Sequence, residues 1–344
     1  MTTFLITGGA GFIGSHLTEA VLEKGHRVLT LDDLSSGSIE NLAAVRNHPG
    51  FEFVPESVTD KHVLAELVDR ADLIVHLAAT VGVFNIIDSP VKTILNNIGG
   101  TETVLKMAAK KKKRVLIAST SEVYGKSTAI PFHEDADLIS GPTSKSRWSY
   151  ASSKVVDEFL ALAFWREYRV PTTVVRLFNC IGPRQVGRYG MVVPRFIGQA
   201  LDGENLTVYG NGEQSRCFTY VSDIVEWLQL LLASDAAVGE VFNVGNPGEI
   251  TISDLARRII RLTGSKAKIE YIPYEKAYEA GFEDMQRRVP DIAKVIAATR
   301  YSPKVDLDDA LRLTTEWFVK QRLAVPVAAP SLGPLTDDCV PPNR

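Results

Sequence analysis

The amino-acid sequence predicts an α/β fold in which a doubly wound parallel sheet is followed by a smaller C-terminal lobe. Continuous apolar runs alternate with segments of helical length up to about residue 178, and a glycine-rich turn joins the first run to the first helical segment. Continuous rather than alternating apolar runs are typical of strands that are buried on both faces of a sheet. After residue 178, short strands mix with helices in a less regular order, which indicates a separate lobe.

The predicted elements follow from these runs in chain order. In the sheet, strands are predicted at 4–7, 27–31, 51–54, 73–77, 114–119 and 172–177, and helices at 14–24, 61–69, 90–112 and 149–168. After residue 178, strands are predicted at 206–209 and 240–244, and helices at 192–202, 222–233 and 253–263.

The chain is therefore divided into three parts. Residues 1–178 are predicted to form the sheet domain, and 217–248 to return to it. Residues 179–323 are predicted to form mainly the lobe. The segment 324–344 is rich in Pro, Ala and polar residues without a helical period, so a disordered tail is predicted there.

Composition excludes several classes of function. The 344 residues carry a formal net charge of −3, so there is no basic field to attract nucleic acid. Three widely spaced cysteines and six unclustered histidines offer neither a disulfide framework nor a metal site. No apolar run approaches the ~20 residues that a membrane span needs, and the first strand begins too early for a signal peptide. A cytoplasmic enzyme without metal or membrane contact is expected.

A dinucleotide site is predicted at the glycine-rich turn. Gly8 permits a tight turn, Gly11 lets the backbone approach a pyrophosphate, and Gly14 lets the helix lie close to the sheet. The pyrophosphate would bind at the positive N-terminus of that helix. Asp32 ends the next strand, 18 residues after Gly14, where a carboxylate accepts hydrogen bonds from ribose hydroxyls. It also repels a 2′-phosphate, and residues 33–36 supply no arginine, so the predicted cofactor is NAD rather than NADP.

A catalytic pair is predicted from a YxxxK pattern. Tyr150 and Lys154 lie on one face of a predicted helix. A phenol has a pKa of about 10, and a nearby ammonium group favours the phenolate. We therefore expect Lys154 to lower the pKa of Tyr150, which would make Tyr150 a general base. Thr120 lies at the carboxyl end of the fifth predicted strand, where such sheets bind ligands, and its hydroxyl is expected to share the moving proton.

Further segments carry a resemblance to a known family. They are 8–16 (GGAGFIGSH), Asp32, 76–79 (HLAA), Asn97 with 99–101 (GGT), 119–125 (STSEVYG), Tyr150 with Lys154, Asn179 with 182–184 (GPR), 216–223 (RCFTYVSD) and 243–245 (NVG). On these segments, residues 3–320 resemble the extended short-chain dehydrogenase/reductase superfamily, with its NAD-dependent nucleotide-sugar epimerases, dehydratases and decarboxylases. The resemblance implies a Rossmann-like sheet that binds NAD and a lobe that binds a nucleotide sugar.

The resemblance also implies roles for single residues. The implied cofactor-binding residues are Gly8, Gly11, Phe12, Ile13, Gly14, Asp32, Ser36, Val58, Leu77, Ala78, Ala79, Asn97, Ser119, Tyr150 and Lys154. The implied substrate-binding residues are Asn179, Arg184, Val193, Tyr209, Arg216 and Arg288. Among them, Asn179, Arg216 and Arg288 are implied to hold the pyrophosphate and Tyr209 to lie beside the base, while Arg184 is a second candidate for holding a sugar carboxylate. Residues 57–58 (SV) depart from the family pattern, because relatives often have an acid there that contacts adenine, and the nearest acid after them is Asp60.

Residues 120–122 (TSE) bear on the reaction. Members of the family that remove water carry Thr-Asp-Glu at this place, and Ser121 is a poor acid for that step. C4 epimerases usually carry small neutral residues at the last two positions, which leaves Glu122 unexplained. The pattern resembles UDP-glucuronate decarboxylases, as do 141–150 (GPTSKSRWSY) and 281–291, which contains Arg288. The expected catalytic residues are Tyr150, Lys154, Thr120, Ser121, Glu122 and Arg288.

Two reactions stay open. The favoured prediction is a UDP-glucuronate decarboxylase that forms UDP-xylose or a UDP-4-keto-pentose, with the UDP-sugar as its small-molecule partner. The alternative is a UDP-sugar 4-epimerase of the UDP-glucose or UDP-glucuronate type. A non-catalytic NAD sensor is disfavoured because the Tyr150–Lys154 pair is intact.

A homodimer is implied by resemblance, since relatives pair through helices that match 90–112 and 149–168. The apolar residues offered for such an interface are Ile94, Ile98, Val104 and Leu105, although packing in the protein core explains them equally well.

Overall fold

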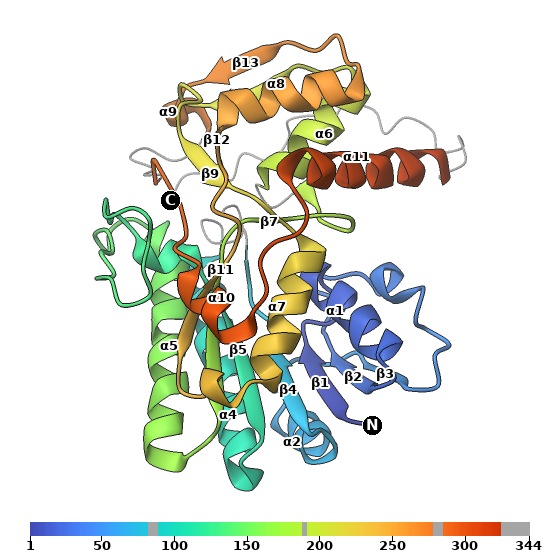
Figure 1. Ribbon diagram of the computed structural model, residues 1–344, viewed down its shortest axis with the longest axis vertical. Helices are drawn as coiled ribbons and strands as arrows, with labels where there is room; N and C mark the ends of the chain where they lie inside the picture. Colours follow the sequence, from blue (N-terminus) through green and yellow to red (C-terminus); the bar gives the residue numbers. More distant parts are fainter. Residues whose placement is uncertain (82–88, 188–190, 278–284, 325–344) are drawn as a thin grey trace, which may run out of the picture.

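A seven-stranded parallel sheet forms the centre of the computed structural model, which describes residues 1–81, 89–187, 191–277 and 285–324 (Figure 1). The strands in spatial order are β11 (Val241–Val244), β6 (Thr172–Leu177), β5 (Arg114–Thr120), β4 (Leu73–His76), β1 (Thr3–Thr7), β2 (Arg27–Leu31) and β3 (Phe51–Val54). All neighbours in this sheet are parallel. The winding direction reverses between β1 and β4, and sheets of this kind bind ligands at that point.

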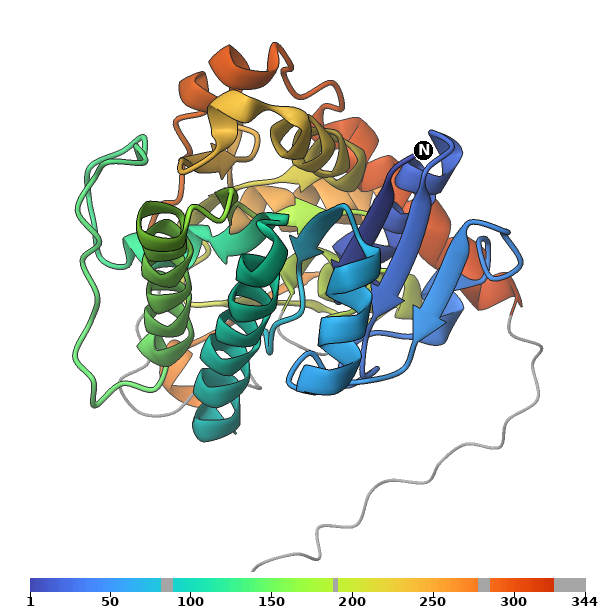
Figure 2. The ribbon, with the colours of Figure 1, turned by 90° about the horizontal axis from the view of Figure 1, so that it is seen from below.

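Helices cover both faces of the sheet. One face carries α2 (Lys61–Arg70), α4 (Pro90–Lys111) and α5 (Trp148–Tyr168), and the other carries α1 (Phe12–Glu23), α7 (Val221–Ala233) and α10 (Ala293–Thr299). The helices α4 and α5 lie side by side (Figure 2). Ile74 is buried with Leu64 and Val104 on the first face, and Ile6 with Trp227 on the second. Burial on both faces explains why the strands are continuous apolar runs.

The C-terminal lobe lies beyond the carboxyl ends of the sheet strands (Figure 1). Its elements, together with the short strands that lead into it, are β7 (Cys180–Ile181), α6 (Val192–Asp202), β8 (Leu206–Tyr209), β9 (Ser215–Cys217), β10 (Thr219–Tyr220), β12 (Glu249–Thr251), α8 (Ile252–Thr263), β13 (Ile269–Ile272), α9 (Tyr274–Ala277) and α11 (Leu307–Ala324). The lobe has its own core, in which Phe196 of α6, Leu255 of α8 and Leu311 of α11 are buried together. Short 3-10 helices are η1 (Ile39–Leu42), η2 (Ser121–Tyr124) and η4 (Asp235–Ala237).

The predicted fold class is confirmed, and each predicted sheet strand is present within one residue of its expected limits. The helix α11 was not predicted, and because it runs to Ala324, the predicted tail begins one residue too early. The remainder of that tail, 325–344, lies outside the described residues, as does 281–284 of the segment leading to Arg288. Within the described ranges, no helix is both long enough and apolar enough to cross a membrane.

Candidate functional site

A cavity of about 720 Å³ lies where the carboxyl ends of the sheet strands meet the lobe. Its wall includes residues that directly follow β1, β2, β4, β5 and β6, together with residues of α5, α6, β8 and β9. Every residue that the sequence placed at the cofactor, substrate or catalytic site lines this cavity, with the exception of Asn97. The fold therefore gathers into one place side chains that are far apart along the chain.

The glycine-rich turn has a backbone that fits a pyrophosphate. Gly8 has φ +74°, and a Cβ there would lie 2.7 Å from the backbone nitrogen of Ala78. A Cβ on Gly14 would lie 2.2 Å from the carbonyl oxygen of Gly8, so the turn and the helix approach too closely for a side chain. The N-cap of α1 is Gly11, with no side-chain cap and no acidic residue in the first turn. The first N–H groups of α1 thus meet the cavity without a competing carboxylate, as an anionic cofactor requires.

Asp32 is held rigidly at the end of β2. Its carboxylate accepts hydrogen bonds from the backbone nitrogens of Ala10 and Leu34, each at 2.9 Å. The residue is only 8% exposed, and this burial raises the pKa of the carboxyl group, while the two hydrogen bonds act in the opposite direction. Ser36 lines the cavity on the same loop. The arrangement fits the ribose-binding role expected of Asp32.

The structure adds detail at three residues of this region. Asn97 is not among the described residues that line the cavity; its amide bonds Thr80 N at 2.8 Å and the hydroxyl of Ser153 at 3.2 Å, so it supports the wall from behind. Ser119 does line the cavity, but its hydroxyl donates to Glu158 at 2.5 Å. Asp60 caps the start of α2 and is absent from the described cavity wall, so it does not replace the adenine-contacting acid of relatives.

Tyr150 and Lys154 lie in the first turns of α5 and both line the cavity. A side-chain hydrogen bond joins Tyr150 to Thr120, as expected from the sequence. The ammonium group of Lys154 donates to Asp157 Oδ2 at 2.6 Å, and the two side chains are 3% and 0% exposed. Asp157 was not identified from the sequence. The spacing on α5 was the available signal, because residues three apart share one helix face.

The pKa of Tyr150 lies above the ordinary value of a phenol, contrary to the expectation. Burial is the largest cause, the negative charge of Glu122 adds to it, and the hydrogen bond from Thr120 opposes it. The ammonium group of Lys154 is paired with Asp157, and the negative charge of Asp157 is one of the causes that raise the pKa of Tyr150. Burial and the charge of Lys154 lower the pKa of His76 to about 3, so this side chain is a neutral part of the wall behind the pair.

Glu122 lies between two arginines at the cavity wall. Arg147 Nη1 is 2.5 Å from Glu122 Oε2, and Arg288 Nη1 is 3.6 Å from Glu122 Oε1. The three side chains are 5%, 16% and 12% exposed for Arg147, Glu122 and Arg288, so their charges interact in a partly dry site. Glu122 and Arg288 therefore lie beside each other at the cavity wall, and Arg147 is a third member of the cluster.

Arg147 was not recognised from the sequence as a site residue, although a signal exists. It is the N-cap of α5 and already has helical dihedral angles. A cation is unfavourable at the positive end of a helix. A cation in this unfavourable place indicates either a functional role or a nearby negative charge that offsets it. Here the carboxylate of Glu122 offsets the charge of Arg147.

Three further arginines line this cavity. Arg216 is 5% exposed and lines the wall beside Asn179. Arg184 pairs with Glu19 at 2.5 Å. The guanidinium group of Arg195 stacks 4.2 Å from the ring centroid of Tyr209, the residue expected beside the base. Arg195 was not predicted; it lies one turn into α6, where the sequence gave no distinguishing pattern.

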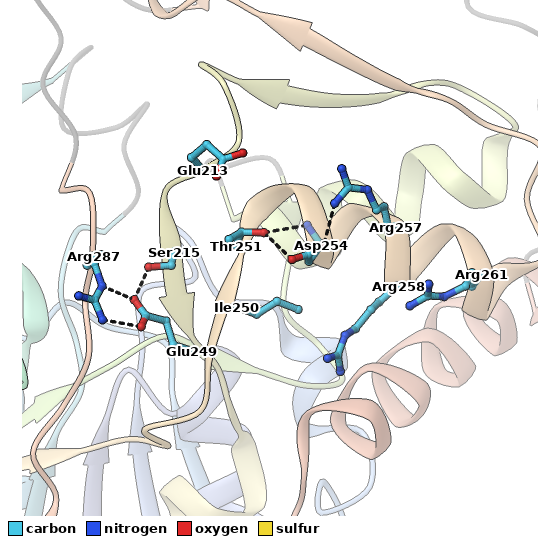
Figure 3. Close-up of a pocket in the computed structure, with 10 residues that line it drawn as sticks. All are labelled: Glu213, Ser215, Glu249, Ile250, Thr251, Asp254, Arg257, Arg258, Arg261 and Arg287. Atoms are coloured by element: carbon cyan, nitrogen blue, oxygen red, sulfur yellow. Dashed lines mark hydrogen bonds and ion pairs between the residues drawn. The ribbon is translucent and has the colours of Figure 1, made fainter.

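A second cavity of about 570 Å³ lies on the other side of β9 and is rich in arginine (Figure 3). Its arginines spread in different directions rather than converging on one point (Figure 3). Three of them are paired with carboxylates: Arg257 with Asp254 at 2.6 Å, Arg258 with Asp308 at 2.6 Å and Arg287 with Glu249 at 2.7 Å. The cofactor and catalytic residues belong to the first cavity.

Comparison with known proteins finds relatives over most of the chain. A UDP-N-acetyl-alpha-D-glucosaminuronate decarboxylase of Bacillus cytotoxicus is 44% identical over 316 residues, which cover 91% of this chain and 97% of that protein. UDP-glucuronic acid decarboxylase 1 of Xenopus tropicalis is 38% identical over 317 residues, which cover 92% of this chain and 72% of that protein.

The fold is shared with solved structures of related enzymes. A UDP-glucuronic acid 4-epimerase from Bacillus cereus, in complex with UDP-glucuronic acid and NAD, superposes with a TM-score of 0.84 at 29% identity, covering 93% of this chain and 98% of that one. Residues 4–245 match the model of the NAD dependent epimerase/dehydratase family. The chain belongs to the NAD-dependent epimerase/dehydratase family, which confirms both the predicted superfamily and NAD as the cofactor.

Proposed function

We propose that this enzyme decarboxylates a UDP-uronate of the UDP-glucuronate type. The observation that carries the proposal is the cluster of Glu122, Arg147 and Arg288, in which two guanidinium groups meet one carboxylate at the cavity wall. A guanidinium group at the cavity wall can bind a sugar carboxylate through charge-assisted hydrogen bonds, which the neutral hydroxymethyl group of a hexose cannot form. The decarboxylase relatives, from Bacillus cytotoxicus and Xenopus tropicalis, support the same reaction class.

The chemistry begins at C4 of the sugar. Tyr150 takes the proton of the C4 hydroxyl, and Thr120 shares it through the hydrogen bond between them. When bound, NAD would supply the hydride acceptor for C4 oxidation. The product of C4 oxidation is a β-keto acid. Its C5–carboxylate bond breaks with release of CO2, the electron pair moves into the C4 carbonyl, and C5 then takes up a proton.

The residues of the cluster handle the carboxylate step. We assign to Arg288 the contact with the leaving carboxylate, because its 3.6 Å distance from Glu122 is the looser of the two ion pairs. Glu122 is assigned to steering that group and to proton delivery at C5. Asn179, Arg184 and Arg216 are assigned to the diphosphate, and Tyr209, stacked with Arg195, to the base.

An epimerase is the second candidate, because C4 epimerisation uses the same Tyr150–Lys154 pair and solved epimerases share the fold. The two reactions are separated by one assay. Purified protein is incubated with UDP-glucuronate, UDP-N-acetylglucosaminuronate and UDP-glucose, and products are measured by mass, NMR and CO2 release. We expect CO2 and a UDP-pentose-type product from a uronate, and no turnover of UDP-glucose. Interconversion of 4-epimers without CO2 would reject the decarboxylase and support the epimerase.

We also propose a cytoplasmic homodimer that pairs through α4 and α5. Two of the four residues offered from the sequence, Val104 and Leu105, are fully buried, so packing in the core of this chain explains them. Exposed apolar residues on these helices include Val91, Leu95, Val156 and Phe159, at 69%, 66%, 39% and 69% exposed. In a dimer whose two-fold axis runs between the α4–α5 pairs of the two subunits, these apolar side chains would be covered. The buried free thiols of Cys180 and Cys217 suit a reducing compartment.

Introducing charge on this apolar face is expected to yield monomers. Leu95→Lys combined with Phe159→Lys removes two of the largest exposed side chains from the proposed interface, and light scattering measures the mass. The matched control is Leu262→Lys on α8, at a residue that is 40% exposed and far from α4 and α5. The dimer proposal fails if the wild-type protein is monomeric at micromolar concentration, or if all three proteins have the same mass.

A further inference from the structure

Arg288 lies on a segment that is held in place on both sides. The backbone nitrogen of Ser215 donates to the carbonyl of Gln286 at 2.9 Å, and that of Phe132 donates to the carbonyl of Val289 at 2.8 Å. Between these two attachments, Arg288 enters the catalytic cavity and its neighbour Arg287 enters the second cavity. The segment therefore connects the two cavities through consecutive side chains.

Arg287 is fixed by a two-pronged ion pair. Its Nε and Nη2 donate to Glu249 Oε1 and Oε2, both at 2.7 Å (Figure 3). Ser215 also donates its hydroxyl to Glu249. The hydrogen bonds from Arg287 are the largest cause of the lowered pKa of Glu249. Bidentate geometry fixes orientation better than a single contact between flexible side chains.

The same pattern is repeated on β9. Ser215 lies in the second cavity, while Arg216 lies in the catalytic cavity. Arg216 Nη1 donates to the carbonyl of Ser215 at 2.7 Å and to that of Gln286 at 3.4 Å. Arg216 and Arg288, which line the catalytic cavity, therefore both depend on the position of the backbone near Ser215 and Gln286. The ion pair and hydrogen bond among Arg287, Glu249 and Ser215 fix that backbone from the second cavity.

We propose that Arg287, Glu249 and Ser215 form a rear clamp that positions Arg288 and Arg216 for the substrate. This inference rests on the substrate contact assigned to Arg288 in the proposed function. The clamp residues are positioning residues, since they line the second cavity and not the first. Exposed ion pairs add little to stability, so the consequence of losing the clamp is misplacement of Arg288, and small misplacements at a reacting group are costly.

Removal of the clamp is expected to lower kcat/KM for the UDP-uronate roughly tenfold, in both Arg287→Ala and Glu249→Gln, with little change in Tm. The matched control is Arg257→Ala. Arg257 lines the same cavity and is as exposed as Arg287 (side chains 56% and 55%). Its ion pair, at 2.6 Å, is with Asp254 of its own helix. The control should keep wild-type kinetics. The exchanged pair Arg287→Glu with Glu249→Arg should recover part of the loss.

A double-variant cycle shows whether the clamp acts through Arg288. In an Arg288→Ala background, Arg287→Ala should add little further loss, because the positioned group is already gone. If the losses in kcat/KM of Arg287→Ala and Arg288→Ala multiplied in the double variant, the clamp proposal would be overturned. Wild-type kinetics in Arg287→Ala would overturn it as well. Normal turnover of the Arg288→Ala variant by itself would instead reject the role of Arg288 in the proposed function. The two failures are therefore distinguishable.

Discussion

Tyr150→Phe is expected to reduce turnover by a factor on the order of 10² or more, the usual cost of losing a general base. The substitution keeps the aromatic ring and removes the hydroxyl that bonds Thr120. The fold should persist, because only one polar group is lost from the start of α5. Steady-state kinetics with the UDP-uronate, together with a Tm measurement, checks both parts of the expectation.

A second buried tyrosine provides the matched control. Tyr124 is fully buried, and its hydroxyl donates to Asn243 at 2.7 Å outside the described cavity wall. Tyr124→Phe should therefore lower Tm while leaving turnover near the wild-type rate. If Tyr150→Phe retained wild-type turnover, Tyr150 could not be the base.

The charge near Tyr150 also predicts a pH effect. Asp157 is one of the negative groups that raise the pKa of Tyr150. Asp157→Asn removes that charge, so the phenol should ionise at lower pH, and the rising limb of kcat against pH should move to lower pH. Lys154→Ala should move it to higher pH. A shift of the Asp157→Asn limb to higher pH would contradict this electrostatic description.

The sheet could be predicted from the sequence because its determinants are local. The run 115–118 is apolar throughout because β5 is covered on both faces, and the glycines at 8, 11 and 14 satisfy backbone constraints within one turn. The elements of the lobe were harder to predict from the sequence. Its strands are two to four residues long, and β9 pairs with β12, which follows more than thirty residues later in the chain. Short strands paired over such distances carry no reliable period.

Motifs placed many residues at the cavity, but they predicted neither Arg147 and Arg195 nor the pairings between side chains. Lys154 pairs with Asp157, and Asn97 bonds Thr80 and Ser153. Which carboxylate meets which cation depends on where strands end and helices begin in space. That information is tertiary, so a pattern along the chain does not contain it.

The ion pair between Arg147 and Glu122 is expected to control decarboxylation and to leave C4 oxidation largely intact. Glu122→Gln should lower CO2 release by about 10²-fold or more, while NADH still forms on addition of the UDP-uronate, because oxidation depends on Tyr150. Arg147→Met should show the same separation, since Glu122 loses its 2.5 Å partner and keeps Arg288 at 3.6 Å. It should also lower Tm, because breaking a buried ion pair costs about 3–5 kcal/mol.

A double variant and a distant arginine test whether Arg147 acts through Glu122. Glu122→Gln with Arg147→Met should be no worse in CO2 release than Glu122→Gln, because one residue acts through the other. Arg114→Met removes a different arginine, which bonds Asp235 and the carbonyl of Leu232 at the far end of β5. It should not change the ratio of CO2 to NADH, measured by isotope release and absorbance in one reaction. If Arg147→Met lowered NADH formation and CO2 release equally, Arg147 would act on binding or oxidation rather than through Glu122.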